Sequence, residues 1–81
     1  MNANATKTVL KAVSTNGAPR QFAFYTVTFE SGASEWTAHW GRIGTKGRER
    51  VYRERNGAAA RFAAEDRFYS KIAKGYRKVD A

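Results

Sequence analysis

The sequence of 81 residues contains no cysteine, one histidine and one proline, and no apolar run near the roughly 18 residues of a membrane-spanning helix. Without cysteine, the chain forms no disulfide, zinc knuckle or thiol nucleophile. No carboxylate pair or catalytic triad accompanies His39, so we expect a structural role for this histidine, and no metal, cofactor or enzymatic activity. The N-terminus lacks the hydrophobic region of a signal peptide, which predicts a cytoplasmic protein, free or bound to the nucleoid, that does not associate with membranes.

Positive charge is distributed unevenly along the chain. Lysine and arginine number 15 against 7 aspartates and glutamates, a net charge of +8. Residues 1–41 carry three basic and two acidic side chains, whereas residues 42–81 carry twelve and five, so the second part holds +7 of the excess. An asymmetric excess creates a field that attracts polyanions, although a basic surface can also serve only for solubility.

Four segments have the alternation or the β-branched composition of strands: residues 8–13, 21–30, 35–42 and 48–55. In the third segment, Trp36 and Trp40 share one face. The fourth segment is highly charged, which is tolerable only at an edge or on a solvent-facing side, with Val51 or Tyr52 turned inward. Loops rich in glycine, serine and asparagine separate these segments and indicate antiparallel hairpins.

The pattern changes at Asn56, a favourable N-cap that precedes an alanine-rich segment. Apolar side chains of this segment gather on one sector of the predicted helix: Phe62, Tyr69, Ile72, Ala73 and Tyr76, with Phe68 at the edge. Gly75 is placed to end the helix. Because one helix cannot bury such a stripe alone, we expect an α+β fold, with this long C-terminal helix packed on one face of a small antiparallel sheet of about four strands. Residues 1–6 are expected to form a flexible N-terminus and residues 7–81 a single domain.

Three short motifs occur in order along the chain: F-Y-x-V from Phe24, W-G-R-I-G-x-x-G from Trp40, and K-x-x-x-G-Y from Lys71. With these motifs the chain resembles, from Lys7 to Val79, the WGR domain of poly(ADP-ribose) polymerases and of many bacterial proteins. The resemblance implies an antiparallel sheet with a packed helix, and a role in nucleic-acid binding. In the polymerases the domain is associated with DNA breaks, and catalysis resides in a separate domain. We expect no neighbouring domain in this chain, which argues against a break-signalling role.

The tryptophan and arginine that lie near the strand end in the polymerases correspond to Trp40 and Arg42. An exposed Trp40 can stack on a base or a sugar. However, Trp40 shares a strand face with Trp36 and can instead belong to the core. Of the two, we expect Trp36 to be the more buried. The Arg42 guanidinium can hold a phosphate through two parallel hydrogen bonds, or can instead form an ion pair with an internal glutamate.

Lys46 and Arg48 flank Gly47 in the glycine-rich loop, where freed backbone N–H groups and two cations can hold a phosphate. This loop leads into a strand, not a helix, so its glycine spacing gives no support to nucleotide hydrolysis. Arg50 lies further along the same strand, although one strand cannot direct all of its arginines at one ligand. The basic residues of the predicted helix form no single stripe, and we expect most of them to be solvated.

Together these patterns predict a non-catalytic module that binds nucleic acid, DNA rather than RNA, through phosphate contacts and aromatic stacking. The predicted site consists of Trp40, Arg42, Lys46, Arg48 and Arg50. No segment resembles a base-reading helix, so we expect little sequence preference, and strand ends are a candidate target. The alternative is an adaptor that docks on an acidic protein partner, because an aromatic side chain ringed by arginines is also typical of a protein hot spot. We expect the chain to be a monomer.

Overall fold

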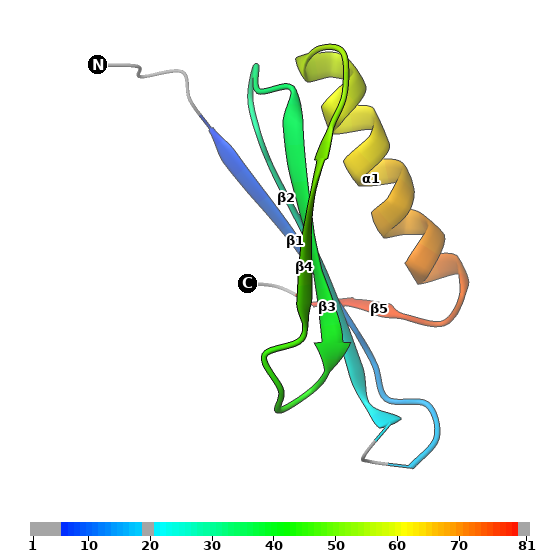
Figure 1. The fold of residues 1–81 in the computed structure, drawn as a ribbon. Coiled ribbons are helices and arrows are strands. Elements are labelled where there is room, and N and C mark those ends of the chain that lie inside the picture. The colour runs from blue at the N-terminus through cyan, green and yellow to red at the C-terminus, as the bar shows by residue number, and fades with distance from the viewer. Residues whose placement is uncertain (1–5, 19–20, 80–81) are drawn as a thin grey trace.

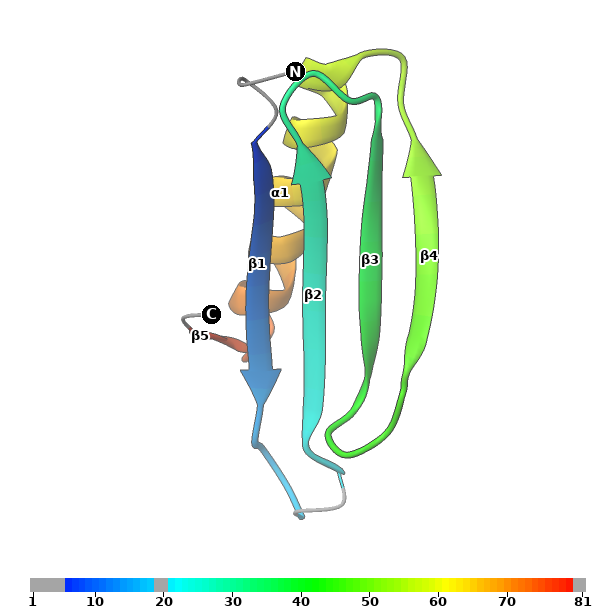
Figure 2. The same cartoon turned by 90° about the vertical axis from the view of Figure 1, so that its left-hand side faces the viewer.

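Five strands and one helix make up the computed structural model, which describes residues 6–18 and 21–79. In chain order they are β1 (Lys7–Ser14), β2 (Ala23–Glu30), β3 (Glu35–Arg42), β4 (Arg48–Arg53), α1 (Gly57–Ala73) and β5 (Arg77–Val79). The strands form one antiparallel sheet in the order β4-β3-β2-β1-β5, and α1 packs on one face of it (Figures 1 and 2). The predicted α+β fold is confirmed, with five strands where about four were expected.

The N-terminal segment predicted to be flexible, residues 1–6, lies outside the described residues except for Thr6. The Thr6 carbonyl oxygen accepts a hydrogen bond of 2.9 Å from the Ser31 N–H group. Within the described ranges, no helix has the length and apolar character needed to span a bilayer.

The strand that the sequence did not predict is β5, which follows the helix and pairs with residues 11–13 of β1. The helix ends in a Schellman motif: the Tyr76 N–H donates to the Lys71 carbonyl and the Gly75 N–H donates to the Ile72 carbonyl, both at 3.1 Å. This motif turns the chain back toward β1. The three residues of β5 are too few to show an alternating pattern, and two of them are charged, so only their pairing identifies them as a strand.

Strand register decides which side chains face α1. The buried residues of β2, which include Tyr25 and Phe29, lie on this face. Trp40 and Trp36 of β3 stand opposite these two residues and share the face. On β4, Tyr52 lies opposite Trp36 and faces the helix, whereas Val51 points to the other face and is 56% exposed. We refer to these two surfaces as the helix-side face and the open face.

The helix approaches the sheet through small side chains. Its buried residues are Ala60, Ala64 and Phe68, spaced four apart. The predicted apolar stripe was wrong in part, because Phe62 is 71% exposed and Tyr69 is 49% exposed. The pattern of bulky apolar residues predicts that these two are buried, yet alanine lets the helix backbone lie close to the aromatic side chains of the sheet. The predicted N-cap is confirmed, since the Asn56 side chain accepts a hydrogen bond of 2.8 Å from the Ala59 N–H.

Candidate nucleic-acid interface

The glycine-rich loop between β3 and β4 is held tightly against the end of β3. A Cβ atom on Gly41 would lie 2.6 Å from the Gly47 Cα atom. A Cβ atom on Gly47 would lie 2.7 Å from the Phe24 ring and would clash with the Trp40 carbonyl oxygen. Gly47 also has a φ of +71°, in the left-handed region. The motif therefore needs glycine at both positions, because backbone and an aromatic ring pack there without room for another side chain.

His39 holds the same loop from the open face. Its Nε2 atom lies 2.6 Å from the Lys46 carbonyl oxygen, and because a carbonyl only accepts, Nε2 is the donor. The imidazole also packs edge-on against the Phe24 ring, with 5.0 Å between ring centres. These contacts give His39 a structural role in placing the loop that follows the tryptophan–glycine–arginine sequence.

The two tryptophans of β3 have different surroundings although both face the helix side. Trp36 is 3% exposed, stacks on Tyr52 with 4.4 Å between ring centres, and donates a 3.1 Å hydrogen bond from Nε1 to the Glu54 carboxylate. Trp40 is half-buried, with its ring centre 6.4 Å from that of Tyr25. Trp36 is thus the more buried tryptophan, as predicted, and Trp40 is packed only in part.

Four of the five predicted site residues point to the helix-side face. Strand alternation and register place Trp40 and Arg42 of β3 there, together with Arg48 and Arg50 of β4. All three arginines are exposed. Figure 1 shows that the end of β3 and the start of β4 extend past the C-terminal end of α1, so the helix leaves this part of the face uncovered. Lys46 lies in the loop with an exposed side chain, apart from this group.

A small notch lies between α1 and this uncovered part of the sheet. It has a volume of about 110 Å³ and is lined by Tyr25, Trp40, Tyr52, Arg67 and Lys71, which we call the basic-aromatic notch. The Arg67 guanidinium lies 5.5 Å from the centre of the Tyr52 ring, and Lys71 Nζ lies 5.2 Å from the centre of the Tyr25 ring. Its volume is below the ~300 Å³ typical of small-molecule pockets. The notch can therefore seat one group of a larger ligand but cannot enclose a whole one.

Arg50 and Tyr76 do not line the notch but lie beside residues that do. Arg50 places its guanidinium 5.2 Å from the Tyr52 ring centre, so Tyr52 has arginines from both β4 and α1 over its ring. Lys71 also lies 6.0 Å from the Tyr76 ring centre. The K-x-x-x-G-Y motif thus has a structural meaning: it ends the helix and places the lysine beside two tyrosines.

The Tyr25 hydroxyl is the one buried polar side-chain atom without a hydrogen-bond partner among the described residues. Burial raises the pKa of Tyr25 above its ordinary value of 10.0, and the nearby Arg67 guanidinium lowers it by less. The hydroxyl groups of Tyr52 and Tyr25 in turn raise the pKa of Arg67. Arg67 therefore lies close enough to act electrostatically on the Tyr25 oxygen, yet not in the geometry of a hydrogen bond, and the phenol keeps a proton to donate.

The cations of the notch and Arg42 have no ion-pair partner among the described residues. No residue that lines the notch is acidic. Within the described residues, ion pairs join Arg53 to Glu35 and Arg61 to Glu65 at 3.5 Å, so Arg42 forms no ion pair with an internal carboxylate. The alternative of an internally paired Arg42 is therefore not realised, and its guanidinium remains available to a ligand.

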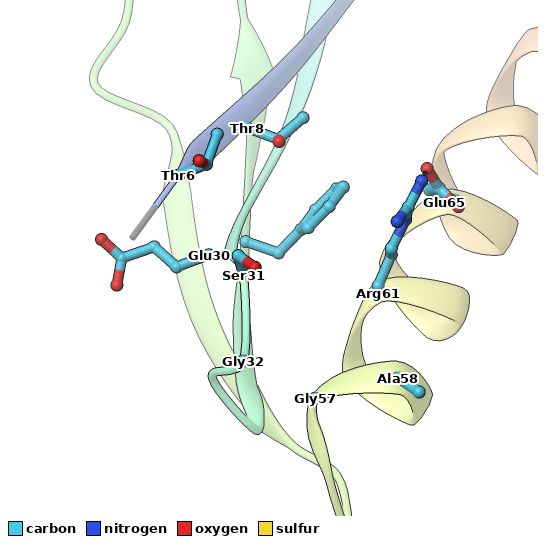
Figure 3. Close-up of a pocket in the computed structure, with 10 residues that line it drawn as sticks. Thr6, Thr8, Glu30, Ser31, Gly32, Gly57, Ala58, Arg61 and Glu65 are labelled. Atoms are coloured by element: carbon cyan, nitrogen blue, oxygen red, sulfur yellow. Dashed lines mark ion pairs between the residues drawn. The ribbon is translucent and has the colours of Figure 1, made fainter. Parts of the chain in front are cut away.

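A hollow larger than the notch lies at the other end of the helix (Figure 3). It measures about 540 Å³ and lies between the start of α1, the start of β1 and the β2–β3 turn. Its charged lining residues are Glu30, Arg61 and Glu65, and the last two are paired with each other. With two carboxylates against one guanidinium, this hollow does not attract a polyanion, and it contains none of the predicted site residues.

The sequence did not identify Arg67 and Lys71 as members of the site. Most helix cations were expected to be solvated, although Lys71 begins the K-x-x-x-G-Y motif. Their spacing of four residues places them on one side of a helix, which is a signal that could have selected them. That this side meets Trp40 and Tyr52 depends on the register of β3 and β4, which only the structure gives.

A family model of the WGR domain matches residues 7–81, which is nearly the whole chain. No curated protein and no solved structure matches the chain significantly. The match covers every described strand and the helix, including the loop at Gly41 and Gly47. The chain therefore belongs to the WGR domain family.

Proposed function

We propose that this protein binds nucleic acid, DNA in preference to RNA, through the uncovered part of the helix-side face. The observation that carries the proposal is a set of five cations from β3, β4 and α1 on one face, of which Arg50, Arg67 and Lys71 lie beside aromatic rings. The other two are Arg42 and Arg48. Membership of the WGR family supports it, because WGR domains are modules of the nucleic-acid-binding type. The excess of +7 in the second part of the chain supplies the long-range attraction.

Phosphates and rings have separate places on this surface. Arg67 and Lys71 can hold a phosphate at the mouth of the basic-aromatic notch. Arg48 lies directly opposite Trp40 on the neighbouring strand and can contact the next phosphate. The exposed part of the Trp40 ring can stack on a sugar or base that is not itself stacked on both sides, which favours a strand end.

Little sequence preference follows from the same geometry. The side of α1 that faces the solvent carries Phe62, Asp66 and Tyr69, not a row of side chains suited to base edges. Contacts to phosphate fix position and carry no sequence information. The proposed complex therefore depends on charge and on the ends of the duplex more than on its sequence.

Fluorescence anisotropy with blunt duplex, 5′-phosphorylated duplex and single-stranded DNA tests the proposal at several salt concentrations. Five phosphate contacts predict a log–log salt slope of about −4.5 on duplex DNA, roughly 0.9 per contact. Arg48→Ala or Arg67→Ala should reduce the slope by about one contact. Arg77→Ala is the matched control, because Arg77 is an exposed arginine of the open face. Trp40→Ala should remove the preference for ends while retaining most of the salt dependence.

Two results contradict the proposal. One is an equal loss from Arg77→Ala and Arg67→Ala, which would mean that only net charge matters. The other is affinity that does not change with salt. Retention of a protein partner from a nuclease-treated lysate, together with absent DNA binding, would instead favour the adaptor function, with the same arginines facing an acidic protein.

A further inference from the structure

The outer edge of β4 is an unpaired strand edge of the sheet. β4 is the first strand in the order β4-β3-β2-β1-β5, so its other side has no neighbour among the described residues. The Glu54 N–H, just beyond the strand, donates to the Ser34 carbonyl at 2.8 Å. The N–H and C=O groups of successive residues point alternately to the two sides of an antiparallel strand, and those of residue 54 point toward β3. The N–H and C=O groups of residues 49, 51 and 53 therefore point outward, where another strand can pair with them.

The side chains of this edge are complementary to themselves. Two identical strands that pair in antiparallel fashion about a two-fold axis place residues of the same face opposite each other. Two such registers pair five residues within β4, one centred on Arg50 and one on Val51. The register centred on Arg50 sets that arginine against its own copy. The register centred on Val51 sets Val51 against Val51 and Glu49 against Arg53.

The register centred on Val51 also fits the contacts already present. Arg53 pairs with Glu35 on the open face, so an incoming Glu49 would complete a row of glutamate, arginine and glutamate across two chains. On the helix-side face, Arg50 would stand opposite the Tyr52 of the second copy, and its guanidinium already lies over a tyrosine ring at 5.2 Å. Val51 is among the exposed large hydrophobic residues, at 56%, and this register covers it.

We infer that two copies of the chain associate through β4, in antiparallel pairing centred on Val51, to form a continuous sheet of ten strands. The two-fold axis is perpendicular to the sheet, so both helices and both basic-aromatic notches lie on the same side. The assembly presents two copies of Arg48 and Arg50 next to the seam between the chains. This inference replaces the sequence-based expectation of a monomer, and it does not depend on whether nucleic acid binds.

Cysteine cross-linking in a chain without native cysteine tests the register directly. In the proposed pairing the two copies of residue 51 are about 5.5 Å apart between Cα atoms, within the disulfide range of roughly 4.4–6.8 Å. The two copies of residue 49 are about 14 Å apart, four residues at about 3.4 Å. Val51→Cys should form a disulfide dimer in mild oxidant at least about tenfold faster than Glu49→Cys or Val9→Cys, the latter an open-face control on β1.

Sedimentation equilibrium of the cysteine-free chain gives the second measurement. Near 0.15 M salt, repulsion beyond about 8 Å is screened, so the dimer should be populated and its fraction should rise with protein concentration. Glu49→Lys should weaken the dimer by about tenfold or more, because it sets like charges opposite each other twice. Glu30→Lys makes the same charge change at an exposed site away from β4 and should leave the dimer unchanged.

Three results would overturn the inference. They are a monomer at all accessible concentrations, equal cross-linking of Val51→Cys and Val9→Cys, and faster cross-linking of Arg50→Cys than of Val51→Cys. The last would place an interface at β4 in the register that the charges disfavour.

Discussion

Two tryptophans of β3 lie on the helix-side face, one where α1 covers the sheet and one where it does not. Trp36 and Trp40 are four residues apart on β3 and point the same way. Over Trp36 lie α1 and Tyr52, and the indole N–H is bonded to Glu54. Trp40 lies opposite Arg48, beside Tyr25, and lines the notch together with Arg67 and Lys71 of α1. The same residue type on the same face is thus core or candidate site according to how far the helix reaches.

Substitution of the two tryptophans should give the largest contrast. Trp36→Ala removes a fully packed ring and leaves the Glu54 carboxylate without its donor, so we expect a loss of about 3–5 kcal/mol in the free energy of unfolding. Trp40→Ala removes a half-buried ring and should cost about 1–2 kcal/mol. Urea denaturation followed by circular dichroism measures both. Equal losses would show that Trp40 is core and would remove its proposed role in stacking.

Much of this contrast could be read from the sequence. Alternation in residues 35–42 placed both tryptophans on one face, and the motif singled out Trp40 and Arg42. What the sequence could not give is the length of sheet that α1 covers, because this depends on where the helix crosses β2 and β3. For the same reason Phe62 and Tyr69 were assigned to the buried stripe, whereas Ala60, Ala64 and Phe68 carry the contact. The notch forms only where α1 and β4 come together, so Arg67 and Lys71 were not predicted as site residues.

The loop that follows Trp40 offers a second, intermediate contrast between two glycines. Gly47→Ala forces a Cβ against the Trp40 carbonyl and the Phe24 ring at a φ of +71°, and we expect a loss of about 2–4 kcal/mol in unfolding free energy. Gly44 has a φ of +94° but open space around it. Gly44→Ala should therefore cost only the backbone strain, about 1–2 kcal/mol. Thermal and urea unfolding compare the two, and DNA binding of the folded Gly44→Ala protein shows whether loop conformation matters apart from stability.

If Gly44→Ala were the more damaging of the two, the close packing at Gly47 would not be what holds the loop. The contrast is informative because both glycines lie in the W-G-R-I-G-x-x-G motif and would appear equally required in the sequence. The structure distinguishes them. Gly44 is needed only for the backbone conformation of the turn, whereas Gly47 is needed for its backbone conformation and for the close packing of the loop against β3.

The smallest expected effect concerns the unpaired hydroxyl of Tyr25, a residue that belongs to the core and also lines the basic-aromatic notch. Tyr25→Phe removes a buried hydroxyl without a partner and should stabilise the protein by about 0–1 kcal/mol near neutral pH.

Burial raises the pKa of Tyr25 in the folded state, so the unfolded chain loses this proton first as pH rises above about 10. Ionisation of this tyrosine in the unfolded chain therefore lowers the stability of wild type at alkaline pH, and Tyr25→Phe should lose less between about pH 9 and 11. Urea denaturation across that range measures the difference, with Tyr69→Phe as the control for an exposed phenol. A Tyr25→Phe protein that is less stable near neutral pH would mean that the hydroxyl has a partner after all, and Arg67 is the residue placed to be it.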